Sequence, residues 1–248
     1  MLESRESTPE EERLAGLRFR VHLPAEEGVS PKDRPLVVMV HGRAGDFNVM
    51  WIFSKVIQGV RPVIVAPQAT VPDDGGTPGK VGYSWWRVDD KPPEDEAARR
   101  IEVRKEMLAA IERLVFFVDR VEQLFGTDRS QRIGFGFSQG AALIGSASII
   151  HPELFSGVAM LAGMLPKSLA DEPGVFPVDF RARAKYFIAH GTEDKIVPFY
   201  RAEQSRNLLQ LHGAEVDFVS EPVGHKTGSV AMRRLGEWYH RLQKKSDR

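Results

Sequence analysis

The chain has 248 residues, 42% of them apolar, and carries 34 Lys and Arg against 34 Asp and Glu. Its length suits one α/β domain or two small ones, and its balanced charge gives no reason to expect nucleic acid or an anionic membrane as partner. The absence of cysteine excludes disulfides, thiolate catalysis and cysteine-ligated metals, and it fits a cytoplasmic protein.

The N-terminal stretch is strongly acidic. It reads MLESRESTPEEERLAG and lacks the apolar segment of a signal peptide, and no apolar run in the chain approaches a membrane span. We therefore expect a soluble, cytoplasmic protein. We expect residues 1–15 to form a solvated polar arm, a candidate for disorder, and residues 16–248 to form a single domain.

Short apolar runs predict the strands of a sheet. Continuous rather than alternating apolar character indicates strands that are buried on both faces, as in a parallel sheet. The predicted strands cover residues 17–23, 36–40, 61–66, 132–137, 157–161, 185–190 and 215–220.

Amphipathic stretches between these runs predict helices. The clearest covers residues 94–125, with acidic residues in its first turn and Gly126 as its C-cap. The other predicted helices cover residues 48–58, 139–150, 200–211 and 225–243. Strands that alternate with helices favour a doubly wound, mostly parallel α/β sheet with helices on both faces.

Two segments do not follow this alternation. Residues 67–93 contain five Pro and four Gly, and residues 163–184 form a second irregular stretch. Long loops inside a compact domain are usually functional or covering elements. We therefore interpret residues 67–93 as a lid or a pocket wall.

Gly136-Phe137-Ser138-Gln139-Gly140 matches the G-x-S-x-G pattern of a nucleophile elbow. The pattern alone is weak, but here it lies between a predicted buried strand and a predicted helix rich in small residues, as the elbow requires. The alternative is that Ser138 only caps that helix, although a cap does not need glycines on both sides.

A serine nucleophile needs a base and an orienting acid, which in this elbow arrangement follow in the order Ser, acid, His. His225 is the histidine after Ser138 that lies in a loop between a predicted strand and a predicted helix. For the acid we favour Asp194 over Glu193 in the loop after the 185–190 strand. The alternative for Asp194 is a turn residue or a helix cap near Tyr200.

Two backbone N–H groups should stabilise the oxyanion of acyl transfer. The N–H of Gln139, next to the nucleophile, and that of Arg43, after the 36–40 strand, are the candidates. The Arg43 side chain either meets a substrate anion or is solvated, and we favour the solvated state. Trp85 and Trp86 either line a substrate pocket or belong to the core.

Five motifs occur together in a fixed order. They are Val40-His41-Gly42-x-x-Gly45-Asp46, Ala66-Pro67, the elbow, His190-Gly191-Thr192-x-Asp194-x-Ile196-Val197-Pro198 and Gly224-His225. With these motifs, roughly residues 34–240 resemble the phospholipase/carboxylesterase family, which includes bacterial carboxylesterases and acyl-protein thioesterases.

The resemblance implies an α/β-hydrolase fold, with Ser138, Asp194 and His225 as a cofactor-free triad and with Arg43 and Gln139 at the oxyanion hole. The chain departs from the family at Arg43, where many relatives carry an apolar residue. It also departs at residues 85–87, where it has Trp-Trp-Arg, and in the Pro/Gly-rich residues 67–82. These departures leave substrate preference open.

The sequence thus predicts a serine hydrolase that cleaves small-molecule carboxylic esters or thioesters through an acyl-enzyme, without cofactor or metal. Alternatives are an acyltransferase or peptidase of the same fold, or a binding protein without turnover. Acyl length, ester against thioester preference and oligomeric state stay open, with a homodimer as one alternative.

Overall fold

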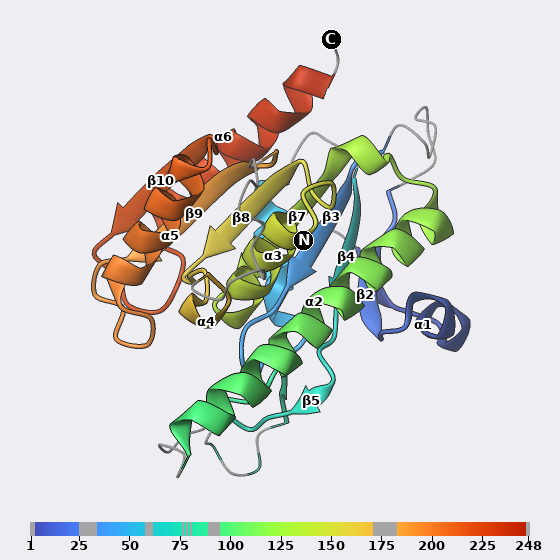
Figure 1. Ribbon diagram of the computed structural model, residues 1–248. Coiled ribbons are helices and arrows are strands. Elements are labelled where there is room, and N and C mark those ends of the chain that lie inside the picture. Colours follow the sequence, from blue (N-terminus) through green and yellow to red (C-terminus); the bar gives the residue numbers. More distant parts are fainter. Residues whose placement is uncertain are drawn as a thin grey trace.

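The computed structural model describes residues 3–24, 34–57, 62–75, 77, 79, 81–88, 95–170 and 183–246. Within them an eight-stranded sheet has the order β1-β2-β4-β3-β7-β8-β9-β10 (Figure 1). Its strands are β1 (Arg5–Glu6), β2 (Phe19–His22), β3 (Leu36–Val40), β4 (Val63–Pro67), β7 (Arg132–Phe137), β8 (Gly157–Leu161), β9 (Lys185–Gly191) and β10 (Val216–Glu221).

Most neighbouring strands are parallel. The pairs from β4 through β3 to β10 are parallel, whereas β2 pairs antiparallel with both β1 and β4. The predicted doubly wound, mostly parallel sheet is therefore confirmed, with an antiparallel edge at its N-terminal side.

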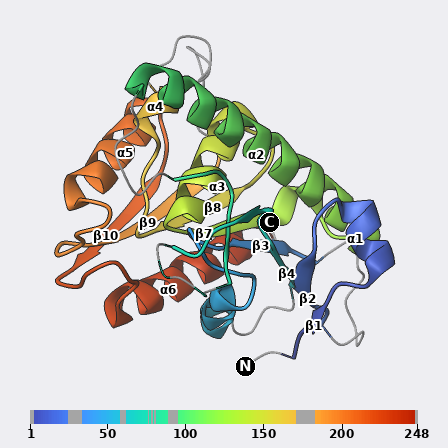
Figure 2. The same cartoon turned by 90° about the horizontal axis from the view of Figure 1, so that it is seen from below.

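Helices cover both faces of the sheet (Figure 2). On one face lie α2 (Glu96–Phe125), α3 (Gln139–Ile150) and α5 (Phe199–Leu211), and on the other lie α6 (Ser229–Ser246) and the 3-10 helix η2 (Val49–Val56). The shorter helices are α1 (Pro9–Ala15), η3 (Arg129–Gln131) and α4 (Lys167–Ala170).

The two layers explain the continuous apolar run of β3. Leu36, Val38 and Val40 pack in the cluster that contains α2 and α3, whereas Val37 and Met39 pack in the cluster that contains η2 and α6. Successive side chains of a strand point to opposite faces, so a strand covered on both faces needs apolar residues at every position.

The predicted ends agree with the structure for α3 and within one residue for α5, whereas the helix predicted over residues 225–243 is α6, which begins at Ser229 and ends at Ser246. Asp95 caps α2 by accepting a hydrogen bond from the N–H of Ala98 at 2.9 Å, and Gly126 ends it with φ of 64°. The predicted start at residue 94 lies outside the described residues. The helix expected over residues 48–58 is instead the 3-10 helix η2, which ends at Val56.

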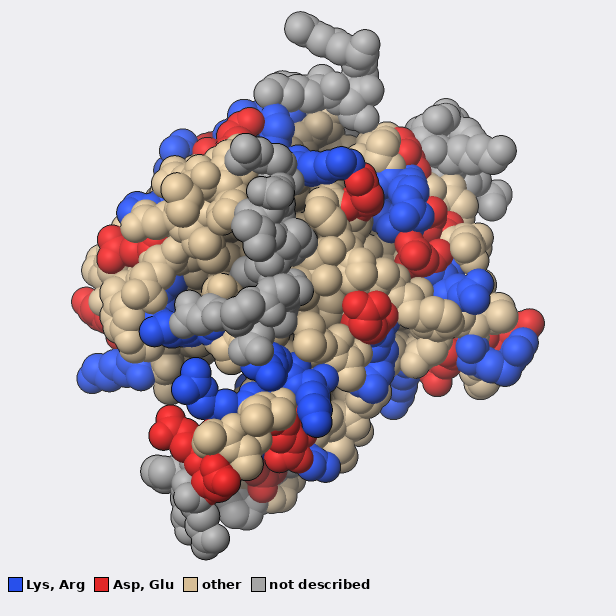
Figure 3. Space-filling model, viewed as in Figure 1, with Lys and Arg blue, Asp and Glu red and all other residues tan. Residues whose placement is uncertain are grey.

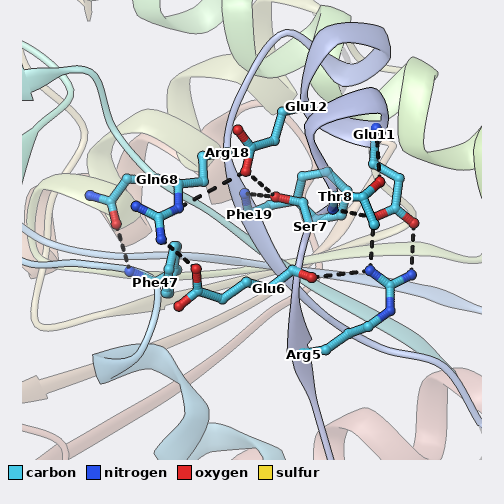
Figure 4. Close-up of polar contacts among 10 residues, drawn as sticks. All are labelled: Arg5, Glu6, Ser7, Thr8, Glu11, Glu12, Arg18, Phe19, Phe47 and Gln68. Carbon is cyan, nitrogen blue, oxygen red and sulfur yellow. Dashed lines mark hydrogen bonds and ion pairs between the residues drawn. The ribbon is translucent and has the colours of Figure 1, made fainter.

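The N-terminal arm differs from the expectation. Residues 5–6 form a strand paired with β2, and α1 has a capping box in which Thr8 and Glu11 satisfy each other's backbone N–H groups. Arg5 donates two hydrogen bonds to Glu11, at 2.7 and 2.8 Å (Figure 4). The acidic residues that suggested a solvated arm are thus the partners that fold it.

Parts of the two irregular segments are described. Within residues 67–93, β5 (Val71–Pro72) and β6 (Tyr83–Ser84) form a two-stranded antiparallel ribbon, while residues 76, 78, 80 and 89–93 lie outside the described residues. Within 163–184, α4 is described and residues 171–182 lie outside.

Lys and Arg are interspersed with Asp and Glu over the face that carries α2 and α5 (Figure 3). None of the described helices combines the length and the apolar character that crossing a bilayer requires.

Candidate functional site

Ser138 lies at a sharp turn between β7 and α3. Its φ of 52° is unusual for a residue with a side chain. The turn is possible because glycines flank it: a Cβ added to Gly140 would lie 2.1 Å from the carbonyl oxygen of Val40. The Ser138 side chain makes no capping hydrogen bond to α3, which argues against a purely capping role.

Three predicted residues meet at the carboxyl edge of the sheet. Nε2 of His225 lies 2.9 Å from Oγ of Ser138, and Nδ1 of His225 lies 2.7 Å from Oδ2 of Asp194. These residues follow β7, β9 and β10, whose parallel pairing brings their carboxyl ends to one edge. The arrangement is a hydrogen-bonded chain from a hydroxyl through an imidazole to a carboxylate.

Asp194 is fully buried and well supplied with donors. Its Oδ1 accepts hydrogen bonds from the N–H groups of Ile196 and Val197 at 2.8 and 2.9 Å. Burial raises the pKa of Asp194, but the hydrogen bonds from His225 and the two N–H groups outweigh it and hold the pKa below its usual value. Asp194 is therefore ionised near neutral pH and accepts the Nδ1–H of His225. The alternative acid, Glu193, is exposed.

A second histidine contacts the same carboxylate. Nε2 of His190 lies 2.8 Å from the carbonyl oxygen of Val197 and 3.3 Å from Oδ2 of Asp194. Its side chain is fully buried. His190 thus supports the loop that orients Asp194, a role that the sequence did not reveal because the residue only ends a predicted strand.

Both candidate oxyanion donors lie next to the nucleophile in the chain or in space. Gln139 begins α3, directly after Ser138. The loop of Arg43 packs on Ser138, since a Cβ added to the neighbouring Gly42 would lie 3.2 Å from Cβ of Ser138. The backbone of this loop therefore borders the hydroxyl, and the oxyanion role of its N–H group stays a prediction.

The Arg43 side chain is not simply solvated, so that prediction is wrong. Its Nε donates to Oδ2 of Asp73 at 3.0 Å. Asp73 also accepts a hydrogen bond from Ser84 at 2.7 Å, and Oγ of Ser84 accepts one from the N–H of Ala44 at 3.0 Å. Burial raises the pKa of Asp73, but these donors hold the pKa below its usual value. The network ties the loop after β3 to the β5–β6 ribbon.

Of the two alternatives for Trp85 and Trp86, the structure supports the core, and neither residue lines the cavity beside Ser138. They are 2% and 7% exposed and pack in the cluster of α2 and α3. The Gln139 side chain accepts from the N–H of Trp85 at 2.9 Å and donates to the carbonyl of Trp86 at 3.0 Å. These hydrogen bonds join the backbone of Trp85 and Trp86 to the first residue of α3.

A cavity of about 790 Å³ opens beside Ser138 and His225. Its wall is mainly apolar, and the charged residues that border it are Arg43, Asp46 and Lys226. The large apolar residues of the wall are Val49, Met50, Ile52 and Phe53 of η2, with Val81, Phe137, Ile196 and Met232. The sequence did not reveal them, because an apolar side chain in a pocket wall has the same chemical character as one in the core. Val81 belongs to the Pro/Gly-rich segment, part of which is thus a cavity wall.

The part of the chain that the structure describes holds no cluster of three or more His, Cys, Asp or Glu that could bind a metal ion.

Comparison with known proteins identifies relatives of the whole region. The sequence model of the phospholipase/carboxylesterase family matches residues 26–242. Carboxylesterase SOBER1 of Arabidopsis thaliana is 26% identical over 176 residues, 68% of this chain and 72% of that protein. A probable inactive carboxylesterase of Oryza sativa subsp. japonica is 26% identical over 174 residues, 68% of this chain and 67% of that protein.

Solved structures share the fold at lower identity. The Bacillus cereus carboxylesterase superposes with a TM-score of 0.73 at 18% identity, covering 93% of this chain and 96% of that one. Esterase PE8 superposes with a TM-score of 0.72 at 22% identity, covering 89% and 96%.

Proposed function

Since the chain belongs to the phospholipase/carboxylesterase family and has the α/β-hydrolase fold, we propose that it hydrolyses carboxylic esters or thioesters with Ser138, His225 and Asp194. The observation that carries this proposal is the hydrogen-bonded chain of these three side chains at the wall of an apolar cavity. An uncharged ester or thioester fits that wall, and no metal or cofactor takes part.

In the first half of the reaction, Nε2 of His225 takes the proton of Ser138 while Oγ attacks the carbonyl carbon. Asp194 stabilises the imidazolium that forms and fixes its orientation. The tetrahedral intermediate then expels the alcohol or thiol, which leaves with the proton from His225. The product of this half is an acyl-enzyme on Ser138.

In the second half, water replaces the alcohol. His225 takes a proton from the water, whose oxygen attacks the acyl carbon, and the second tetrahedral intermediate collapses to release the carboxylic acid and restore the Ser138 hydroxyl. In both halves the N–H groups of Arg43 and Gln139 stabilise the oxyanion, a contribution that is typically about 3 kcal/mol for one donor.

The direct test replaces the nucleophile. Ser138→Ala should lower kcat/KM for p-nitrophenyl acetate by about 10⁴- to 10⁶-fold, because no other step can form the acyl-enzyme. Ser146→Ala is the matched control: Ser146 lies on α3, is buried, and has no hydrogen-bond partner among the described residues. Undiminished turnover by Ser138→Ala would exclude the mechanism.

The rice relative named as a probable inactive carboxylesterase favours a second candidate, a binding protein that keeps the fold without turnover. A fluorophosphonate separates the two. The enzyme should be labelled stoichiometrically on Ser138, with loss of labelling in His225→Gln. A binding protein should show ligand affinity with neither labelling nor turnover.

A further inference from the structure

Two arginines connect the N-terminal segment to the cavity wall. Arg18 and Arg20 belong to the β1–α1–β2 segment, which lies before the residues that the family model matches. Phe19 and Val21 face the core and are 0% and 1% exposed. Because side chains alternate along a strand, Arg18 and Arg20 point to the opposite face, where η2 lies.

Arg20 joins three parts of the chain. Its Nε and Nη2 donate to the side chain and backbone oxygens of Ser4, at 2.7 and 3.2 Å. Its Nη1 donates to Oδ1 of Asn48 at 3.0 Å, and its guanidinium lies 5.9 Å from the centre of the Trp51 ring. The planar guanidinium thus contacts Ser4 on one side and the start of η2 on the other.

Arg18, two residues earlier in the chain, makes a similar connection. Its guanidinium lies 5.4 Å from the centre of the Phe47 ring and is ion-paired with Glu6 and Glu12 (Figure 4). The N–H of Phe47 donates to the Gln68 side chain at 3.2 Å. Phe47, just before η2, is therefore held twice: Arg18 contacts its ring, and its N–H group makes a buried hydrogen bond to Gln68.

The element that receives these contacts is weak on its own. A 3-10 helix has poorer hydrogen-bond geometry than an α-helix, and runs of more than three or four residues are uncommon. η2 spans 8 residues and supplies four of the apolar residues of the cavity wall. Asn48 stands at its N-cap position but makes no capping bond, since its side-chain oxygen meets Arg20. Asp46 accepts the N–H groups of Asn48 and Val49 instead.

We propose that Arg18 and Arg20 are positioning residues that set the chain-length selectivity of the hydrolase by fixing η2 against the cavity. The inference rests on the proposed function for its kinetic consequence. Neither arginine contacts the reacting atoms, so the chemistry on a short ester does not depend on them. An ester with a longer apolar chain contacts the η2 wall and does depend on its position.

The test compares Arg20→Met with the wild type on p-nitrophenyl acetate and octanoate, and on methyl and octyl butyrate. Methionine keeps the apolar stem and removes the donors. In Arg20→Met, KM should rise by about three- to tenfold for p-nitrophenyl octanoate, for octyl butyrate or for both, while kcat on p-nitrophenyl acetate stays unchanged. Arg20→Lys should give an intermediate effect, since one ammonium cannot reproduce the planar contacts with both Ser4 and Asn48.

The matched control is Arg5→Met. Arg5 lies in the same segment, but its hydrogen bonds go to Glu6 and Glu11. It should destabilise the segment without changing selectivity. Adding Arg18→Met to Arg20→Met should increase the change. Equal chain-length selectivity in wild type, Arg20→Met and the double variant, in both ester series, would overturn the proposal.

A readout without substrate separates this inference from the proposed function. Hydrogen exchange over residues 47–57 should quicken by about three- to tenfold in Arg20→Met and stay at the wild-type rate in Arg5→Met, while exchange over residues 222–231 stays unchanged in both. If the protein proved to have no esterase activity, this measurement would still test the positioning role. Unchanged exchange over 47–57 would refute that role even in an active enzyme.

Discussion

The two sides of the cavity are held in different ways. On the acid–base side, the loops of Asp194 and His225 are joined by backbone hydrogen bonds, from Thr192 N–H to the carbonyl of Glu221 at 2.8 Å and from Glu193 N–H to the carbonyl of Val223 at 3.1 Å. On the opposite side, one backbone bond, from Tyr83 N–H to the carbonyl of Gly45 at 2.9 Å, is joined by side-chain contacts that hold the wall, Arg43–Asp73 at the β5–β6 ribbon and Arg20–Asn48 at η2.

This difference separates chemistry from selectivity. Backbone hydrogen bonds survive most substitutions, because every residue except proline supplies the same donor and acceptor. Side-chain contacts can be gained or lost by one substitution. A fold of this design keeps the positions of its nucleophile, base and acid while the shape of its cavity changes. Variants on the acid–base side should therefore have large effects on turnover, and variants on the opposite side should have small effects that depend on substrate.

After replacement of the nucleophile itself, the largest effect is expected for Asp194→Asn. The amide keeps the shape of the side chain but removes the charge that stabilises the imidazolium and fixes the proton on Nδ1 of His225. The value of kcat on p-nitrophenyl acetate should fall by about 10³- to 10⁴-fold, with KM changed little. Glu193→Gln, at the exposed neighbouring carboxylate, is the control and should stay near wild type. A smaller loss for Asp194→Asn than for Glu193→Gln would reverse our assignment of the acid.

The second-largest effect is expected for a variant of Glu221, a residue that the sequence analysis did not single out. Its carboxylate accepts hydrogen bonds from the N–H groups of Val230 and Ala231, at 3.0 and 2.8 Å, in the first turn of α6. It therefore fixes both ends of the loop that carries His225. Glu221→Ala should lower the free energy of unfolding by about 3 kcal/mol, since two charge-assisted hydrogen bonds are lost, one of them buried and the other partly buried.

Glu221→Ala should also lower kcat by about tenfold, because His225 loses its fixed position. Glu237→Ala is the matched control, since Glu237 lies on the same helix and pairs with exposed arginines. Such a pair contributes at most about 1 kcal/mol. Urea unfolding and ester kinetics on both variants would measure the difference. Equal unfolding free energies for the two variants would contradict an anchoring role for Glu221.

A third prediction concerns pH and His41, at the start of the loop after β3. Burial lowers the pKa of His41 to about 4. Its Nε2 accepts the N–H of Ala69 at 3.0 Å and its Nδ1 lies 2.8 Å from the carbonyl oxygen of Gly42, so the neutral ring donates from Nδ1. In the unfolded chain His41 binds a proton at a higher pH than it does in the folded protein. The free energy of unfolding therefore falls as the pH decreases from the pKa of His41 in the unfolded chain towards its pKa in the folded protein.

From about pH 7 to about pH 5, this group should remove about 2 kcal/mol from the free energy of unfolding. Asp73 and Asp194 have lowered pKa values, so their contributions are lost at lower pH than this range. His41→Gln should flatten the pH dependence measured by urea unfolding. If the free energy of unfolding changed equally with pH in wild type and His41→Gln, His41 would not be the group responsible.

The parts of the fold that the sequence predicted share a physical signature. β3, β7, β8 and β9 are buried on both faces, so most of their residues are apolar, and the exceptions, Arg132, Lys185 and His190, lie at or next to strand ends. The elbow was recognisable because close backbone approach at Gly136 and Gly140 leaves no room for a side chain. Asp194 and His225 could be assigned because parallel strands bring their carboxyl ends together.

The failures also have physical causes. The acidic composition of the N-terminal segment predicts a polar arm, whereas its capping box, Thr8 with Glu11, is also visible in the sequence and indicates the start of a helix. η2 was expected to be a longer helix, since apolar spacing does not distinguish a 3-10 helix from an α-helix. Trp85 was a candidate pocket residue because its type does not reveal where the ring lies. Both the cavity wall and the partner of Arg43 depend on contacts between distant parts of the chain.

The smallest effect is expected for Arg43→Met. Asp73 would keep its hydrogen bonds from Ser84 and from the N–H of Gly75, and the loop would keep the bond from Tyr83 N–H to the carbonyl of Gly45 at 2.9 Å. The free energy of unfolding should therefore change by less than about 1 kcal/mol. Turnover of p-nitrophenyl acetate should stay within about twofold of wild type, because the proposed oxyanion donor is the backbone N–H of residue 43, which methionine retains.

Asp73→Asn sharpens the test at the same ion pair. It should destabilise the protein more than Arg43→Met does, since the amide weakens all three donor contacts to Asp73, whereas the methionine removes one of those three. A loss of about 100-fold in kcat for Arg43→Met would instead place the guanidinium on the oxyanion, at the expected strength of one lost donor. The cavity side would then take part in the chemistry, and the contrast between the two sides would fail at this residue.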